Sequence, residues 1–214
     1  MITKSQKLFT FLAKKFSKVE TKSSNFNHSD IEGFLKAQRT AYECVESVAK
    51  LLRPGMTEIE AAQLLSDHLT TRGYKLFLHR PFAWFGNHSR FDPYEYDFNL
   101  YRPSDRKLKI EDVVILDVSP IVDGYIGDVG YTTSLTPGQK DLLEAKKFLL
   151  KIRGLIPEYF SSELDLSEIW RKVNEEIFKA GYDNCHEKYP LRVLGHRVYR
   201  VSRWVRLLRF PLIP

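Results

Sequence analysis

The fold of this chain is decided by residues 113–133, VVILDVSPIVDGYIGDVGYTT. The continuous β-branched apolar run at the start of this stretch predicts a strand that is buried on both faces. Asp123-Gly124 is typical of a two-residue hairpin turn of type I′, which needs positive φ at both central positions. The sequence therefore predicts a β-hairpin in which Val122 pairs with Tyr125.

This register places two carboxylates together. Ser119 would lie opposite Asp128, so Asp117, two residues earlier, projects from the same face as Asp128. Their Cβ atoms are then diagonal neighbours about 7–8 Å apart. Two carboxylates at the end of an apolar strand are costly to desolvate unless they are paired or bound to a metal. A divalent cation between them removes that cost. The alternative is that Asp117 caps a turn and Asp128 faces solvent.

Three motifs resemble one known family. DVSP, DGY and GDVG with Thr132, at residues 117–132, resemble the metal-binding hairpin of the pita-bread metallopeptidases, which include methionine aminopeptidases, Xaa-Pro peptidases and creatinase. RPGMTE at 53–58 resembles the turn between the first two helices of that family, and LGH at 194–196 resembles the segment that supplies a metal-binding histidine. Their order and spacing cover the chain from about residue 30 to 200 and are closest to the Xaa-Pro peptidases.

The resemblance implies a fold, a metal site and a reaction. The fold class is α/β (α+β), a pita-bread fold that is incomplete at its C-terminus. Asp117 would chelate one divalent ion, Asp128 would bridge two, and His196 would bind the second. Carboxylate and imidazole ligands suit Mn, Fe, Co or Zn. The implied reaction is attack of a hydroxide, activated by the two ions, on the N-terminal peptide bond of a peptide with a free N-terminus.

The substrate-binding histidine of the family has no counterpart at its usual place in this sequence. The family commonly places a histidine shortly before the hairpin, but residues 92–106 contain none. His79 and His88, which lie among aromatic residues, are the predicted substitutes for substrate binding. The alternative is an aromatic loop that covers the core.

The family completes its site with two glutamates downstream of the histidine. In this sequence no glutamate follows Glu187. We therefore expect a truncated gene product, or a site completed by another chain, with at most weak metal binding and little aminopeptidase activity. Whether this polypeptide is an active enzyme is left open.

Composition and charge indicate the domain organisation, the location and the alternative functions of the chain. The 214 residues suit one domain, predicted at 29–214 after a basic extension at 1–28. Two cysteines indicate no disulfide framework and favour a cytoplasmic location.

The net charge of +6 is concentrated at both ends, as lysines in the first 22 residues and arginines after residue 191. Two alternatives to an enzyme follow: a catalytically inactive interaction module, and a basic binder of nucleic acid or anionic membrane surfaces, the latter less favoured. Homodimer formation is also left open.

Hydrophobic periodicity, caps and breakers predict the remaining elements. We expect helices at about 31–52, 58–72, 136–156 and 165–180, and a strand at 74–85. Ser29 or Asp30 is expected to cap the first helix, and Thr57 with Glu60 forms a capping-box signature for the second.

Overall fold

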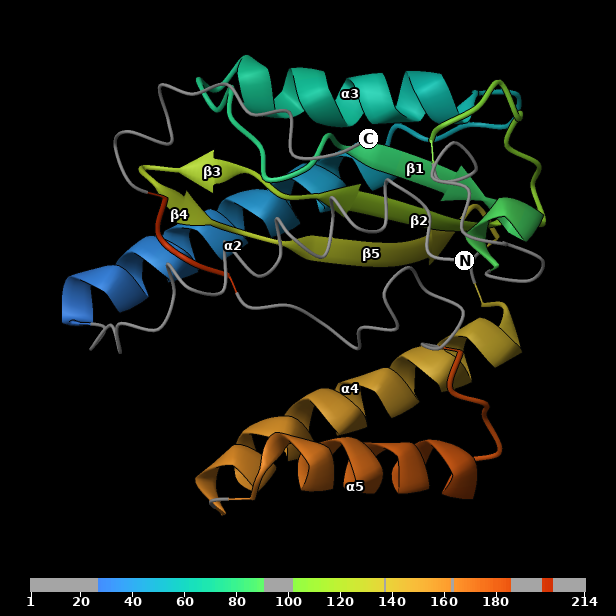
Figure 1. Ribbon diagram of the computed structural model, residues 1–214. Coiled ribbons are helices and arrows are strands. Elements are labelled where there is room, and N and C mark those ends of the chain that lie inside the picture. The colour runs from blue at the N-terminus through green and yellow to red at the C-terminus, as the bar shows by residue number, and fades with distance from the viewer. Residues whose placement is uncertain (1–26, 91–101, 137, 163, 186–197, 202–214) are drawn as a thin grey trace, which may run out of the picture.

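A computed structural model describes residues 27–90, 102–136, 138–162, 164–185 and 198–201 of the chain. Figure 1 shows a small twisted sheet with two helices packed on it and a separate pair of helices beside it. Of the predicted basic extension at 1–28, residues 1–26 lie outside the described residues, and the first described helix begins at His28.

Two helices precede the sheet in the described part of the chain, α2 at His28–Ala49 and α3 at Glu58–Thr70. Thr57 caps α3 in a capping box with Glu60, as predicted. The cap of α2 is Asn27, so the prediction of Ser29 or Asp30 was wrong. Asp30 instead supplies the third-residue carboxylate of the capping box, because its side chain reaches back to the Asn27 backbone N–H.

The strands form two antiparallel sheets. β1 (Phe82–Phe85), β2 (Val113–Val118) and β5 (Val129–Ser134) make a three-stranded sheet in the order β1-β2-β5. β3 (Ile121–Val122) and β4 (Tyr125–Ile126) form the tip of the hairpin. Val122 pairs with Tyr125, and Asp123 and Gly124 have φ of 52° and 94°. The predicted hairpin and its register are confirmed.

One face of the sheet packs on α2 and α3 (Figure 1). Alternate strand residues point to this face, because side chains alternate across a strand. Cys44 of α2 is fully buried here, as expected of a small core residue. The fully buried core residues of the sheet and of these two helices include Ala41, Val45, Val48, Ala61, Leu65, Leu69, Ala83, Phe85, Val114, Leu116 and Val118.

The chain before β1 differs from the predicted long strand. Residues 76–78 run beside 119–121, with Leu78 N–H donating to the Ser119 carbonyl oxygen (2.8 Å) and Ile121 N–H donating to that of Leu76 (2.8 Å). Regular pairing with β2 begins only at Phe82. Pro81 contributes to this interruption, because proline has no N–H to donate to a ladder. The 3-10 helix η1 (Gly86–Ser89) follows β1.

The last two described helices are α4 (Lys140–Ser161) and α5 (Leu166–Lys179), an antiparallel pair joined by a short loop (Figure 1). α4 begins later than predicted, since Thr136 donates to the Ile110 carbonyl oxygen and Gly138 has φ of 86°. Ile152, Ile169 and Val173 form a separate small core. Leu149 of α4 is 55% exposed, outside this core. None of the described helices combines the length and apolar character that crossing a membrane requires.

Candidate metal centre

The hairpin brings Asp117 and Asp128 to the same end of the sheet. Asp117 lies near the end of β2 opposite Gly130 of β5, and Asp128 immediately precedes β5. Gly130 leaves room for the carboxylate, since a Cβ there would lie 3.3 Å from Asp117 Oδ2. The side chains of both aspartates are 21% exposed, so a soluble ion can reach them. The sequence-based prediction that they share a face is confirmed.

Helix α2 fixes the backbone at Asp128. Gln38 accepts a hydrogen bond from Asp128 N–H (3.1 Å) and donates one to the Asp128 carbonyl oxygen (3.0 Å). The preceding Gly127 lies against α2, where a Cβ would come within 2.4 Å of the Ala37 carbonyl oxygen. Ser119 donates to the Gly127 carbonyl oxygen (3.1 Å) and is itself fully buried. Sequence reasoning missed Gln38, because nothing in the pattern of an amphipathic helix marks one polar residue as a hairpin contact.

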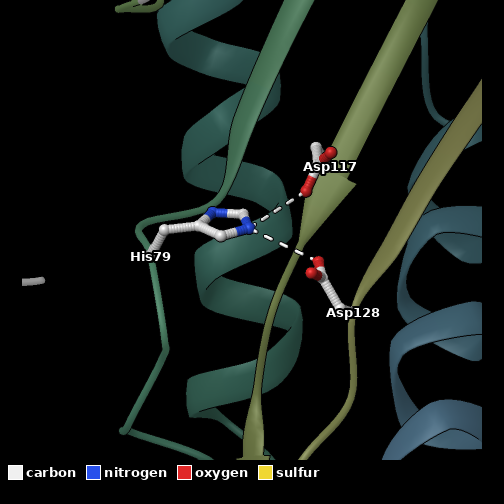
Figure 2. A group of neighbouring side chains, drawn as sticks. All are labelled: His79, Asp117 and Asp128. Atoms are coloured by element: carbon white, nitrogen blue, oxygen red, sulfur yellow. Dashed lines mark ion pairs between the residues drawn. The ribbon is translucent and has the colours of Figure 1, made fainter. Parts of the chain in front are cut away.

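His79 lies between the two carboxylates (Figure 2). Its Nε2 atom is 3.2 Å from Asp117 Oδ1 and 3.5 Å from Asp128 Oδ1. Among the described residues, these three form the group whose ligand atoms could hold one metal ion, with all ligand atoms within 4.8 Å of one another. His79 was predicted to bind substrate; the structure places it at the carboxylates themselves.

The electrostatics of this group favour a positive charge. Burial of the His79 ring lowers its pKa, but the hydrogen bonds to Asp117 and then to Asp128 outweigh burial and raise the pKa to about 10. Without a metal ion, the ring therefore carries the cation that the two carboxylates require. The cluster is built to hold positive charge between oxygen and nitrogen donors, and a divalent ion with carboxylate and imidazole ligands fits this donor set.

His88, the second predicted substrate-binding residue, lies away from this cluster and contacts Glu58. Glu58 is fully buried and accepts hydrogen bonds from Phe85 N–H (2.8 Å) and from the N–H and hydroxyl of Ser104 (2.9 and 2.7 Å). His88 Nδ1 is 2.7 Å from Glu58 Oε2. Glu58 thus ties α3, β1 and the chain before β2 together. Substrate contact by His79 or His88 stays a prediction.

His196, the third predicted metal ligand, lies outside the described residues. Described residues four positions later do reach the hairpin: Arg200 forms an antiparallel bridge with Tyr125, and Val201 N–H donates to the Gly124 carbonyl oxygen (2.6 Å). Arg200 also contacts Asp30 at 3.3 Å, and Asp30 accepts a hydrogen bond from the Tyr125 hydroxyl (2.9 Å). Residues 200 and 201 are therefore anchored to the hairpin and to the start of α2.

The sequence model of Metallopeptidase family M24 matches residues 32–202, a range that includes every residue of the cluster. The chain belongs to metallopeptidase family M24. The metallopeptidase class predicted from the hairpin motif is confirmed at the level of the family, whose members use divalent metals.

Individual M24 relatives are distant and longer than this chain. It is 23% identical over 171 residues to the methionine aminopeptidase of Pyrococcus abyssi, a match that covers 80% of this chain and 53% of the relative. It is 26% identical over 174 residues to the methionine aminopeptidase of Methanocaldococcus jannaschii, covering 80% and 54%. The chain spans about half the length of the curated relatives it matches.

Solved structures show the same fold. The X-Pro aminopeptidase of Thermotoga maritima matches with a TM-score of 0.61 at 18% identity, covering 78% of this chain and 45% of that one. The prolidase of Thermococcus sibiricus matches with a TM-score of 0.59 at 19% identity, covering 73% and 41%. The M24 chain described here has the pita-bread fold, as predicted.

Proposed function

We propose that this chain forms part of the active site of a metal-dependent aminopeptidase-type hydrolase of the Xaa-Pro peptidase kind. The observation that supports this most is the convergence of Asp117 and Asp128 on one imidazole at the hairpin of an M24 chain. The proposed substrate is a peptide with a free N-terminus, cleaved after its first residue. The two distant relatives named above are methionine aminopeptidases, whereas the two solved structures are an X-Pro aminopeptidase and a prolidase.

In this proposal the centre holds two divalent ions. Asp117 would hold one ion, Asp128 would be shared by both, and His196 would hold the second. The anchoring of Arg200 beside Tyr125 supports the part given to His196, because it fixes the chain four residues after that histidine on the hairpin that bears Asp128. The donor types suit Mn, Fe, Co or Zn. Bound ions of this kind polarise a carbonyl and activate water for hydrolysis.

Residues around the proposed centre orient Asp128 and line the site. Gln38 holds the peptide unit of Asp128, so the carboxylate keeps its direction when an ion is bound or lost. Phe82 and Trp84 project from the same face of β1 with ring centroids 4.5 Å apart, and the His79 ring lies 5.5 Å from that of Phe82. Trp84 is only 4% exposed, whereas Phe82 is half-buried. We infer that Phe82, supported by Trp84, contacts the apolar part of the peptide, which is consistent with a proline ring.

The test has two stages. Metal analysis and titration of the purified chain with Mn²⁺, Co²⁺ or Zn²⁺ should show binding that the Asp128→Asn variant loses. Hydrolysis of short Xaa-Pro and Met-Ala peptides is then measured on the loaded chain. We expect weak turnover that is lost in Asp128→Asn, since the sequence has no glutamate after Glu187 to add ligands and proton transfer. Metal binding that is absent, or unchanged in Asp128→Asn, would overturn the proposal and favour an interaction module.

A further inference from the structure

The chain around His79 has an irregularity that aims this side chain. Phe77 bridges Pro120, whereas Phe82 pairs with Asp117. Between these two pairs, four residues on the His79 side (78–81) lie opposite two residues of the partner segment (118–119). The segment that contains His79 must therefore bulge outward. Bulges occur next to active sites, where they redirect a side chain. Here the bulge contains His79, whose ring points back at the two carboxylates (Figure 2).

A contact on the other side of the ring decides which nitrogen gives up its proton when a metal ion binds. Nδ1 lies 3.0 Å from the Arg80 carbonyl oxygen. A carbonyl oxygen can only accept, so Nδ1 carries a hydrogen in this contact. The lone pair of the neutral ring is therefore on Nε2, the atom that faces both aspartates. Histidines that bind metals usually donate their other ring N–H to a carbonyl or carboxylate in this way.

The distances fit ligands of a shared ion. Ligands about 2.0–2.2 Å from one ion, at angles of about 90–110°, lie about 2.8–3.6 Å from each other. Nε2 of His79 is 3.2 and 3.5 Å from its two carboxylate oxygens. Its side chain is 26% exposed, which leaves the ring packed but open to an ion arriving from solvent.

We propose that His79 is a metal ligand of this centre, binding through Nε2 an ion that it shares with Asp117 and Asp128. This assignment rests on the proposed function and replaces, for His79, the substrate contact expected from the sequence. It adds an imidazole ligand that the family resemblance does not supply. The centre then has three metal-binding side chains within the described part of the chain.

Co²⁺ titration of the full chain tests this, with His79→Gln compared to His28→Gln as a control. His28 is a suitable control because its side chain is 87% exposed on the first turn of α2. Loss of a direct ligand should weaken Co²⁺ binding by at least about 10- to 100-fold, the range found for mere supporting partners of ligands. The control should bind like the wild type. X-ray absorption of the Co²⁺-loaded His79→Gln variant should show one imidazole fewer than the wild type.

A second variant keeps the test independent of how His79→Gln folds. In His196→Gln the Co²⁺ spectrum should still show imidazole, supplied by His79, and its absence would overturn the assignment. Unchanged Co²⁺ affinity in a folded His79→Gln variant would overturn it too. So would raised affinity, which is the result if His79 only neutralises the carboxylates and competes with the ion. In each of these cases the proposed function stands as long as Asp128→Asn abolishes binding; a wild type that binds no Co²⁺ overturns both.

Discussion

At the scale of single residues, Glu58 is a fully buried acidic residue whose charge depends on its hydrogen-bond partners. Its carboxylate receives hydrogen bonds from three elements of the chain and is fully buried. Burial raises its pKa, but the hydrogen bonds from His88, Ser104 and Phe85 together outweigh burial, and the net pKa lies below the ordinary value of a glutamate. The ionised form is thus the one that the folded state needs.

Replacing Glu58 tests this directly. Glu58→Ala should lower the free energy of unfolding by about 3–5 kcal/mol, because it removes the hydrogen-bond acceptor of His88 and of two backbone N–H groups in the interior. A folded-state pKa below the unfolded value gives stability that is present above about pH 4.5 and lost as pH falls through the folded pKa. Urea unfolding at pH 7 and pH 3.5 should therefore show a larger loss on acidification for the wild type than for Glu58→Gln. Equal losses would contradict the ionised state of Glu58.

At Gly127 the choice of residue is limited by the space for a side chain and not by the backbone conformation. A Cβ at this position would meet the Ala37 carbonyl oxygen at 2.4 Å. Gly127→Ala should therefore destabilise the protein by about 1–3 kcal/mol and weaken metal binding, since Asp128 must move with it. Gly154 is the matched control: it lies within α4 with nothing near its Cβ position, so Gly154→Ala should stabilise by about 0.5–1 kcal/mol. Thermal unfolding of the two variants should shift in opposite directions.

At the scale of elements, the metal centre depends on how α2 is locked to the hairpin. The hairpin register continues unbroken from β3–β4 into β2–β5, and Gly127 N–H donates to the Pro120 carbonyl oxygen (3.0 Å) at the point where the two sheets meet. Gln38 then fixes the hairpin against the helix at Asp128. The direction of the carboxylate is therefore a property of the α2–hairpin contact and not of the hairpin alone.

We expect Gln38→Ala to lower both stability and metal affinity. Two hydrogen bonds to the Asp128 peptide are lost, at a cost of about 1–3 kcal/mol for the groups left unsatisfied. Gln63→Ala on α3 serves as the control, because Gln63 is exposed and, within the described part of the chain, its side chain bonds to Asp67, a pair worth about 0.2–0.5 kcal/mol. Metal titration and urea unfolding of both variants provide the measurement. A Gln38→Ala variant that behaves like the control would show that the hairpin holds Asp128 unaided.

At the scale of the whole molecule, the described residues form three hydrophobic clusters, of which the cluster of Ala37, Val122 and Tyr125 joins α2 to the tip of the hairpin. The other two are separate cores. The larger lies between the sheet and α2 with α3, and the smaller lies between α4 and α5. α4 meets the larger body through cation–π contacts, with Lys146 over the ring of Tyr131 (5.9 Å) and Arg153 over that of Tyr42 (6.0 Å). Such contacts are worth about 0.5–1 kcal/mol each at exposed sites, so the helix pair is weakly coupled to the metal centre.

Weak coupling predicts separate unfolding of the helix pair. Ile169→Ala removes a buried side chain of the smaller core and should cost that core about 2–5 kcal/mol. Hydrogen exchange should then lose protection in α4 and α5 while α2 and β2 keep theirs. Phe178→Ala, at an exposed position of α5, is the control and should leave both regions unchanged. Loss of protection throughout the variant would mean that the two cores unfold together.

The sequence alone determined the hairpin, its register and the shared face of Asp117 and Asp128, because turn chemistry and the two-residue period of a strand are local. The capping box of α3 and the family were predictable from short motifs for the same reason. Only the tertiary structure decided the positions of His79 and Gln38. His79 reaches the carboxylates through a bulge that depends on pairing with a strand about forty residues later, and Gln38 through the packing of α2, which lies ninety positions from Asp128. Contacts at that sequence separation leave no local pattern, so no periodicity or spacing could have revealed them.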